Sequence, residues 1–131
     1  MFVLSFLYPR PASRRFDYEY HRNVHMALGI GLTMRHLGIQ PKAAWIERID
    51  EDNPASREKY AAVAHVVFET QAQRDLFATL FQNEDASRRL RADWKKYTDA
   101  PPEVRLSRWT TDEDMPALVE RFERDLADLH A

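Results

Sequence analysis

The chain has 131 residues, of which 44% are hydrophobic and 31% are charged, values that are ordinary for one globular domain and exclude wholesale disorder. Its formal net charge of -2 argues against a dedicated nucleic-acid-binding protein, which needs a concentrated basic face. The absence of cysteine excludes disulfides, thiolate metal sites and cysteine nucleophiles.

The first predicted element is a strand at Met1–Tyr8, which is apolar on both faces. Such a strand is typical of a sheet with both faces covered. The run is too short to span a membrane and lacks the features of a secretion signal, so we expect a cytoplasmic protein with no membrane partner. Pro9 ends the strand. A helix follows, with Asp17 as its N-cap, an end near Leu37, and Gly38 as its C′ residue.

The elements up to residue 110 are predicted from apolar runs and from the polar and proline-containing breaks between them. In chain order they are a strand at Lys42–Asp50, a turn at Glu51–Ser56, a strand at Tyr60–Thr70, a short helix at Gln71–Phe81, one or two helical turns within Asn83–Tyr97, and a strand at Glu103–Thr110. Asp85 and Asp93 interrupt a basic cluster in the polar segment, a pattern typical of a solvated face.

The last predicted element is a helix over residues 111–131. Its apolar residues fall on one stripe at helical spacing, and they are Met115, Leu118, Val119, Phe122, Leu126 and Leu129. Asp112, Glu113 and Asp114 lie at its N-terminus, where the helix dipole favours negative charge. We interpret this helix as an amphipathic packing element.

The order β-α-β-β-α-β is that of a ferredoxin-like α+β fold with a four-stranded antiparallel sheet and an extra C-terminal helix. The chain is predicted to be a single domain over 1–131, with a core at about 1–110 and the final helix at about 112–130. In this topology the helices cover one face of the sheet. Because the strands are apolar on both sides, we expect a homodimer in which a second copy covers the open sheet face.

Three segments resemble the EthD-like proteins of the dimeric α+β barrel superfamily. They are Phe16–Tyr20 with His25–Leu28, His65–Thr70, and Ala92–Pro102, and the resemblance covers roughly residues 1–110. It implies a sheet-to-sheet dimer with a pocket between sheet and helices in each subunit. Related proteins include a component associated with fuel-ether degradation, polyketide cyclases, anthrone oxygenases, lactone isomerases and haem-handling enzymes, and the fold does not choose among these.

His25 matches the helix histidine of that family and is the first candidate for acid–base chemistry. A proton-abstraction site also needs a donor for the developing oxyanion. Tyr18, Tyr20 and Tyr8 are candidates, as is Tyr97. In a regular helix, Tyr18 and Tyr20 project about 200° apart, and Tyr18 lies on the side of His25. Both tyrosines can therefore serve one site only if the start of the helix is irregular.

The remaining candidates for substrate binding are His65, Trp45 and Asp99. His65 either faces the pocket or finds a hydrogen bond in the core. Asp99, before two prolines, either acts at the site or caps a turn, and Trp45 either lines an aromatic pocket or packs.

We expect no metal, because the His21 and His25 pair lacks the carboxylate that accompanies it in HExxH sites, even with His65 as a third ligand. Three glycines without a GxGxxG pattern make a nucleotide improbable, and we expect no cofactor.

Two hypotheses follow for the function. The first is a small cofactor-free enzyme, with cyclase, isomerase or monooxygenase-like proton-transfer chemistry on an apolar aromatic or lactone metabolite. The alternative is a non-catalytic protein that binds a small ligand or serves as an accessory subunit of a degradative system. A cavity that joins His25 to a tyrosine hydroxyl favours the first.

Overall fold

The computed structural model describes residues 1–49, 59–110 and 115–130. In chain order its elements are β1 (Phe2–Pro9), α1 (Tyr18–Tyr20), the π-helical turn η1 (His21–His25), α2 (Met26–Leu37), β2 (Ala43–Arg48), β3 (Tyr60–Phe68), α3 (Gln71–Ala78), the 3-10 turn η3 (Thr79–Gln82), α4 (Glu84–Trp94), β4 (Glu103–Arg108) and α5 (Met115–His130). The predicted turn at residues 51–56 and the acidic residues 112–114 lie outside the described residues.

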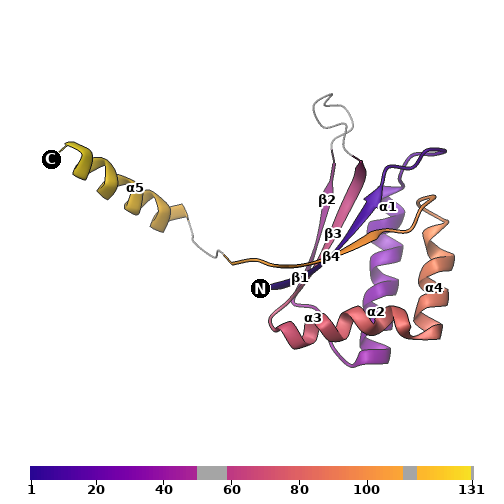
Figure 1. Cartoon of the computed structure of the whole chain (residues 1–131). Coiled ribbons are helices and arrows are strands. Elements are labelled where there is room, and N and C mark those ends of the chain that lie inside the picture. The colour runs from indigo at the N-terminus through magenta and orange to yellow at the C-terminus, as the bar shows by residue number, and fades with distance from the viewer. Residues whose placement is uncertain (50–58, 111–114, 131) are drawn as a thin grey trace.

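The four strands form one antiparallel sheet in the order β2-β3-β1-β4. Helices α2, α3 and α4 lie together on one side of this sheet (Figure 1). The chain therefore has the predicted α+β ferredoxin-like fold. The core lies between sheet and helices, and its larger members are Leu4, Phe6, Tyr8, Phe16, Leu32, Val66, Phe68, Phe77, Leu80, Leu90 and Tyr97.

Local capping explains where the helices begin and end. The Asp17 carboxylate accepts a hydrogen bond from the backbone N–H of Tyr20, and Gly38 takes the left-handed conformation with a φ of 65°. Both caps agree with the sequence prediction. The helix α4 is longer than the one or two turns predicted. Its buried residues Ala86 and Leu90 are four apart, as expected for one face of a helix. Charged residues lie between them, so this short apolar face is hard to detect in the sequence.

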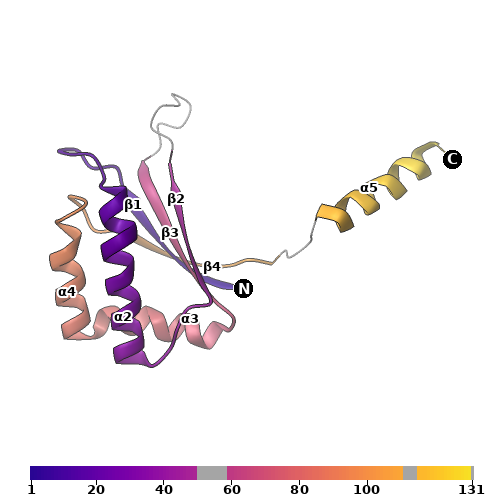
Figure 2. The same cartoon turned by 180° about the vertical axis from the view of Figure 1, so that it is seen from behind.

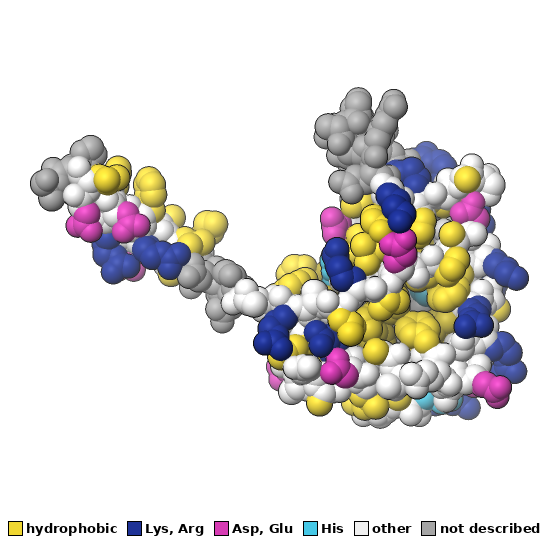
Figure 3. Space-filling view, in the orientation of Figure 1, with side chains coloured by type: hydrophobic (Ala, Val, Ile, Leu, Met, Phe, Trp, Pro, Cys, Tyr) yellow, Lys and Arg dark blue, Asp and Glu magenta, His cyan; other side chains and the backbone are white. Residues whose placement is uncertain are grey.

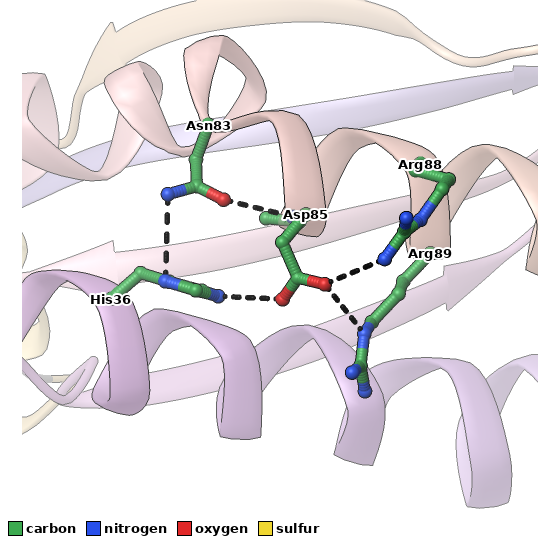
Figure 4. Close-up of polar contacts among 6 residues, drawn as sticks. His36, Asn83, Asp85, Arg88 and Arg89 are labelled. Atoms are coloured by element: carbon green, nitrogen blue, oxygen red, sulfur yellow. Dashed lines mark hydrogen bonds and ion pairs between the residues drawn. The ribbon is translucent and has the colours of Figure 1, made fainter.

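A polar cluster joins the C-terminal end of α2 to the start of α4 (Figure 4). His36 Nε2 lies 3.0 Å from Asp85 Oδ2, and Asn83 Nδ2 lies 3.4 Å from His36 Nδ1. Arg88 and Arg89 each donate to Asp85 Oδ1 at 3.0 Å. The hydrogen bond from His36 is the main reason that the pKa of Asp85 is lowered. The cluster therefore fixes α2 against α4, and these helices flank the site described below.

The sheet face opposite the helices has no helical cover in the described part of the chain (Figures 1 and 2). Side chains alternate along a strand, so Leu4, Phe6 and Tyr8 face the helices while Ser5 and Leu7 lie on the open face. Helix α5 stands apart from the sheet in both views. Among the described residues, no helix combines the length and apolar character needed to cross a membrane.

Candidate functional site

An apolar pocket lies between the sheet and the helices. It is lined by Phe6, Tyr8, His25, Met26, Gly29, Ile30, Thr33, Pro41, Ala44, Val66, Phe77, Leu80, Phe81, Leu90 and Trp94. Hydrophobic side chains also gather in the hollowed surface between sheet and helices in Figure 3. The empty volume is about 520 Å³ with the mouth included, and the cavity itself has a volume of about 40 Å³. The inner part is thus narrow, with room for a few small groups.

His25 is the imidazole in this lining, and a buried carboxylate holds its ring. His25 Nδ1 lies 2.9 Å from Asp93 Oδ2, and both side chains are buried. Burial lowers the pKa of His25, and the hydrogen bond and charge of Asp93 oppose part of that shift. The imidazole is therefore neutral near pH 7. Because a carboxylate accepts the proton on Nδ1, Nε2 keeps its lone pair and remains available as a base.

Asp93 also binds Tyr20, whose hydroxyl donates to Asp93 Oδ1 over 2.6 Å. This hydrogen bond is the main reason that the pKa of Tyr20 is raised to about 12. The basic cluster of this segment is exposed, as predicted, but Asp93 does not share its solvated face, because Asp93 is only 6% exposed. Its position three residues after the buried Leu90 was the available signal, since that spacing puts both on one face of α4.

The π-helical turn explains which tyrosine reaches the histidine. In η1 the backbone N–H of Met26 bonds to His21 O, five residues back. This wider turn changes the angle between successive side chains around the helix axis. Tyr20 and His25, which are also five residues apart, therefore both bond to the carboxylate of Asp93. Tyr18 instead donates to Ala61 O at 2.9 Å, outside the pocket lining. The angular pairing of Tyr18 with His25 expected for a regular helix is therefore wrong.

Tyr8 is the tyrosine that belongs to the pocket lining. Tyr97 donates to the hydroxyl of Tyr8 at 3.1 Å, and Tyr8 lines the pocket. Burial is the main cause that raises the pKa of both phenols, so both stay protonated at neutral pH. Since the Tyr8 oxygen accepts from Tyr97, its own proton remains free to bind a ligand. The ring of Tyr97 also lies 4.7 Å from that of His25.

His21 is fully buried, and neither of its ring nitrogens has a hydrogen-bond partner within the described residues. Its ring packs against Tyr8 at 4.9 Å and against Tyr97 at 5.2 Å. Burial, followed by the charge of His25, lowers the pKa of His21 to about 4. The His21 and His25 rings stack at 5.7 Å rather than converging on one point. Within the described ranges, no three His, Asp or Glu side chains form a group able to hold a metal ion.

His65 and Trp45 lie on the open sheet face and not in the pocket. His65 Nδ1 bonds to Ser5 Oγ at 2.8 Å, and Nε2 bonds to Glu47 Oε1 at 3.1 Å. Both ring nitrogens of His65 therefore make hydrogen bonds, and these bonds link β1, β3 and β2 across the sheet face. Trp45 is 60% exposed and contacts the ring of Trp109 at 5.5 Å. The structure separates both residues from His25 by the thickness of the sheet.

Asp99 holds a turn at the end of β1, as one of its two sequence interpretations expects. It accepts hydrogen bonds from the backbone N–H groups of Ala12 and Ser13 and from the Ser13 hydroxyl. The hydroxyl of Ser13 is the main cause that lowers the pKa of Asp99. Asp99 does not contribute to the pocket lining.

Fold and site together define a small α+β domain with a histidine–aspartate pair beside an apolar pocket. An EthD-like protein from Ralstonia eutropha shares the fold with a TM-score of 0.65 at 15% identity, over 86% of this chain and 95% of that protein. An ethyl tert-butyl ether D (EthD) family protein from Bacillus halodurans gives a TM-score of 0.52 at 15% identity, over 84% and 99%. No family model and no curated protein matches the sequence. The chain therefore has the fold of EthD-like proteins, and the fold implied by the resemblance is confirmed.

Proposed function

We propose that this protein is an EthD-like enzyme that binds a small apolar carbonyl compound in the pocket and uses His25 as its general base. One observation carries the proposal: a histidine whose Nδ1 lies 2.9 Å from the buried carboxylate of Asp93 lines an otherwise apolar pocket. An oriented imidazole in a water-poor site is suited to proton transfer.

The chemistry assigned to each group follows from its hydrogen bonds. His25 Nε2 removes a proton from a carbon beside the carbonyl, and the electrons of that C–H bond move onto the carbonyl oxygen. Tyr8 donates its free proton in a hydrogen bond to the oxygen as negative charge develops there. Asp93 stabilises the imidazolium that forms and keeps the ring in place. His25 then returns the proton to carbon or to oxygen, so the cycle requires no oxidant.

The lining also limits the substrate. Thr33 lies in the wall, but its hydroxyl donates to Gly29 O at 2.7 Å within the same helix. The groups left for recognition are the His25 imidazole and the Tyr8 hydroxyl, with no cation in the lining to bind an anionic group. The substrate class is thus a neutral ketone, lactone or flat aromatic carbonyl, small enough for a narrow pocket.

The test is hydrogen–deuterium exchange at carbon, followed by NMR in D2O with a panel of small apolar ketones and lactones. The native protein should accelerate exchange beside the carbonyl of at least one compound. His25→Gln should reduce the rate by about 100-fold or more, the usual contribution of a general base. His65→Gln is the matched control and should keep the native rate, because His65 lies on the other sheet face.

Binding of the panel without accelerated exchange would contradict the catalytic assignment and support the alternative, a ligand-binding or accessory protein. Equal exchange rates for native protein and His25→Gln would remove His25 from the mechanism. Ligand binding is measured separately by native mass spectrometry, so that a loss of binding is distinguished from a loss of chemistry.

We also propose that the protein forms a homodimer through the open sheet face. Trp45 and Trp109 stand on this face as a contacting aromatic pair, and the row of Ser5, His65 and Glu47 lies beside them. Aromatic residues that remain exposed in one subunit are typical of interface centres.

A further inference from the structure

The amphipathic helix α5 carries an apolar stripe that its own chain leaves uncovered. Phe122 is 63% exposed and Leu129 is 81% exposed, and the stripe continues through Met115, Val119 and Leu126. Most of the stability of a helix of this length comes from packing of its apolar face. The stripe therefore needs a surface to pack on, and Figures 1 and 2 show α5 pointing away from its own sheet.

The spacing of the stripe is that of two coiled-coil heptads, and an acidic residue lies on each of its borders. At about 100° per residue, Glu123 and Asp125 fall on opposite borders of the stripe, whereas Arg124 lies on the far side. A partner surface that combines apolar residues with a basic neighbour would complement these borders.

The edge strand β4 provides such a surface, which we call the β4 strip: Val104, Leu106 and Arg108. They are every second residue of β4, so their side chains share the face of the strand on the helix side. They pair with Phe6, Leu4 and Phe2 of β1. Val104 is 54% exposed and Leu106 is 50% exposed, although both pair with buried positions of the central strand. Arg108 places a guanidinium at the end of the strip, over the ring of Phe2.

We propose that α5 of one copy docks on the β4 strip of a second copy, in a reciprocal exchange of C-terminal helices. The apolar stripe would cover Val104 and Leu106, and an acidic border residue, Glu123 or Asp125, would face Arg108. Because each chain carries both the helix and the strip, one two-fold axis satisfies both contacts. The surface adjoins the pocket, since Phe6 is paired with Val104 and also lines the pocket.

The absence of cysteine allows a direct test with single-cysteine variants of the full chain. Leu106→Cys and Phe122→Cys are mixed and treated with a short bis-maleimide, and the products are identified by mass spectrometry. We expect a mixed Leu106→Cys/Phe122→Cys dimer as the main product. The matched control is Arg124→Cys mixed with Leu106→Cys, which should give only background cross-linking because Arg124 lies on the opposite side of α5.

Three results would overturn the proposal. One is a mixed product no more abundant than the Arg124→Cys control. Another is a homodimer of Phe122→Cys as the main product, which would mean that two α5 helices pair. The third is an internal cross-link within the double variant Leu106→Cys/Phe122→Cys, which would mean that α5 docks on its own strand. None of these readouts depends on catalysis, so the result is independent of the function proposed for the pocket.

Discussion

Among single residues, the candidate site consists of hydrogen bonds that link Tyr20, Asp93 and Nδ1 of His25. Tyr20 and His25 share the Asp93 carboxylate, at 2.6 Å and 2.9 Å respectively. This arrangement fixes the ring of His25 and directs its protonation to Nδ1. Tyr8 supplies a separate hydroxyl whose acceptor side is already used by Tyr97. In the proposed mechanism, the wall therefore offers His25 as the base and Tyr8 as the donor to a ligand.

His21 has the opposite character, because it makes no hydrogen bond from its ring within the described structure. Its pKa is lowered from 6.5 to about 4 by burial, so the unfolded chain binds a proton at pH 5 that the folded chain excludes. Above pH 6.5, His21 is neutral in both states and does not lower the free energy of unfolding. As the pH falls from 6.5 toward 4, protonation of the unfolded chain lowers that free energy by up to about 3 kcal/mol.

The prediction for His21 uses His21→Phe, which keeps a ring among Tyr8, Phe16 and Tyr97. The variant should unfold with a higher free energy than the native protein at pH 5, and the advantage should shrink toward pH 7. Urea unfolding at several pH values measures both. Parallel pH dependence of the two proteins would show that His21 does not titrate on unfolding.

At the scale of elements, α4 joins two parts of the molecule. Its first turn carries Asp85, which is bonded to His36 of α2, and its last turn carries Asp93, which is bonded to His25 of η1. The two ties fix α4 at both ends against the preceding helical segment. The site geometry therefore depends on the distant cluster of Figure 4.

The prediction for this tie is that Asp85→Asn lowers the melting temperature at neutral pH. The pKa of Asp85 is below its ordinary value of 3.8 in the folded state, so its contribution is present above pH 3.8 and is lost as the pH falls further. The difference between native and variant should therefore decrease under acid conditions. Arg91→Ala, an exposed change in the same helix, is the control and should leave the melting temperature unchanged.

The sequence predicts the elements that depend on local chemistry, and it misses the features that depend on packing. The Asp17 and Gly38 caps are local, and both were predicted with the right residues. Alternation on β3 groups His65 with Val63 and Val67, but a period of two cannot say which face meets the helices. The π turn at His21–His25 likewise has no local signature, so the meeting of Tyr20 with His25 was not predictable.

At the scale of the whole molecule, two surfaces remain to be covered: the open sheet face and the stripe of α5. On the sheet face, Trp45 and Trp109 form an exposed aromatic pair. On the stripe of α5, Phe122 and Leu129 are exposed. Large exposed apolar groups of this kind mark contact surfaces in soluble proteins. Both proposals place a second copy of the chain on these surfaces.

The prediction for the sheet face is that Trp45→Glu shifts the monomer–dimer equilibrium at least about tenfold toward monomer, since it places a charge in an apolar interface. Sedimentation equilibrium at micromolar concentrations measures the dissociation constant. Met34→Glu changes an exposed apolar residue on α2 and should leave association unaltered. A native protein that stays monomeric in this range would contradict the proposed dimer.

In the proposed mechanism, His25 presents a bare Nε2 to the pocket while Asp93 holds its Nδ1 proton. Long-range ¹H–¹⁵N NMR of the imidazole rings measures this directly, with His25→Gln to assign the signals. At pH 7 we predict a neutral His25 with its proton on Nδ1, and a further lowering of its pKa in Asp93→Asn, because the carboxylate charge favours the imidazolium. A His25 that is charged at pH 7, or that carries its proton on Nε2, would contradict the assignment of this residue as the base.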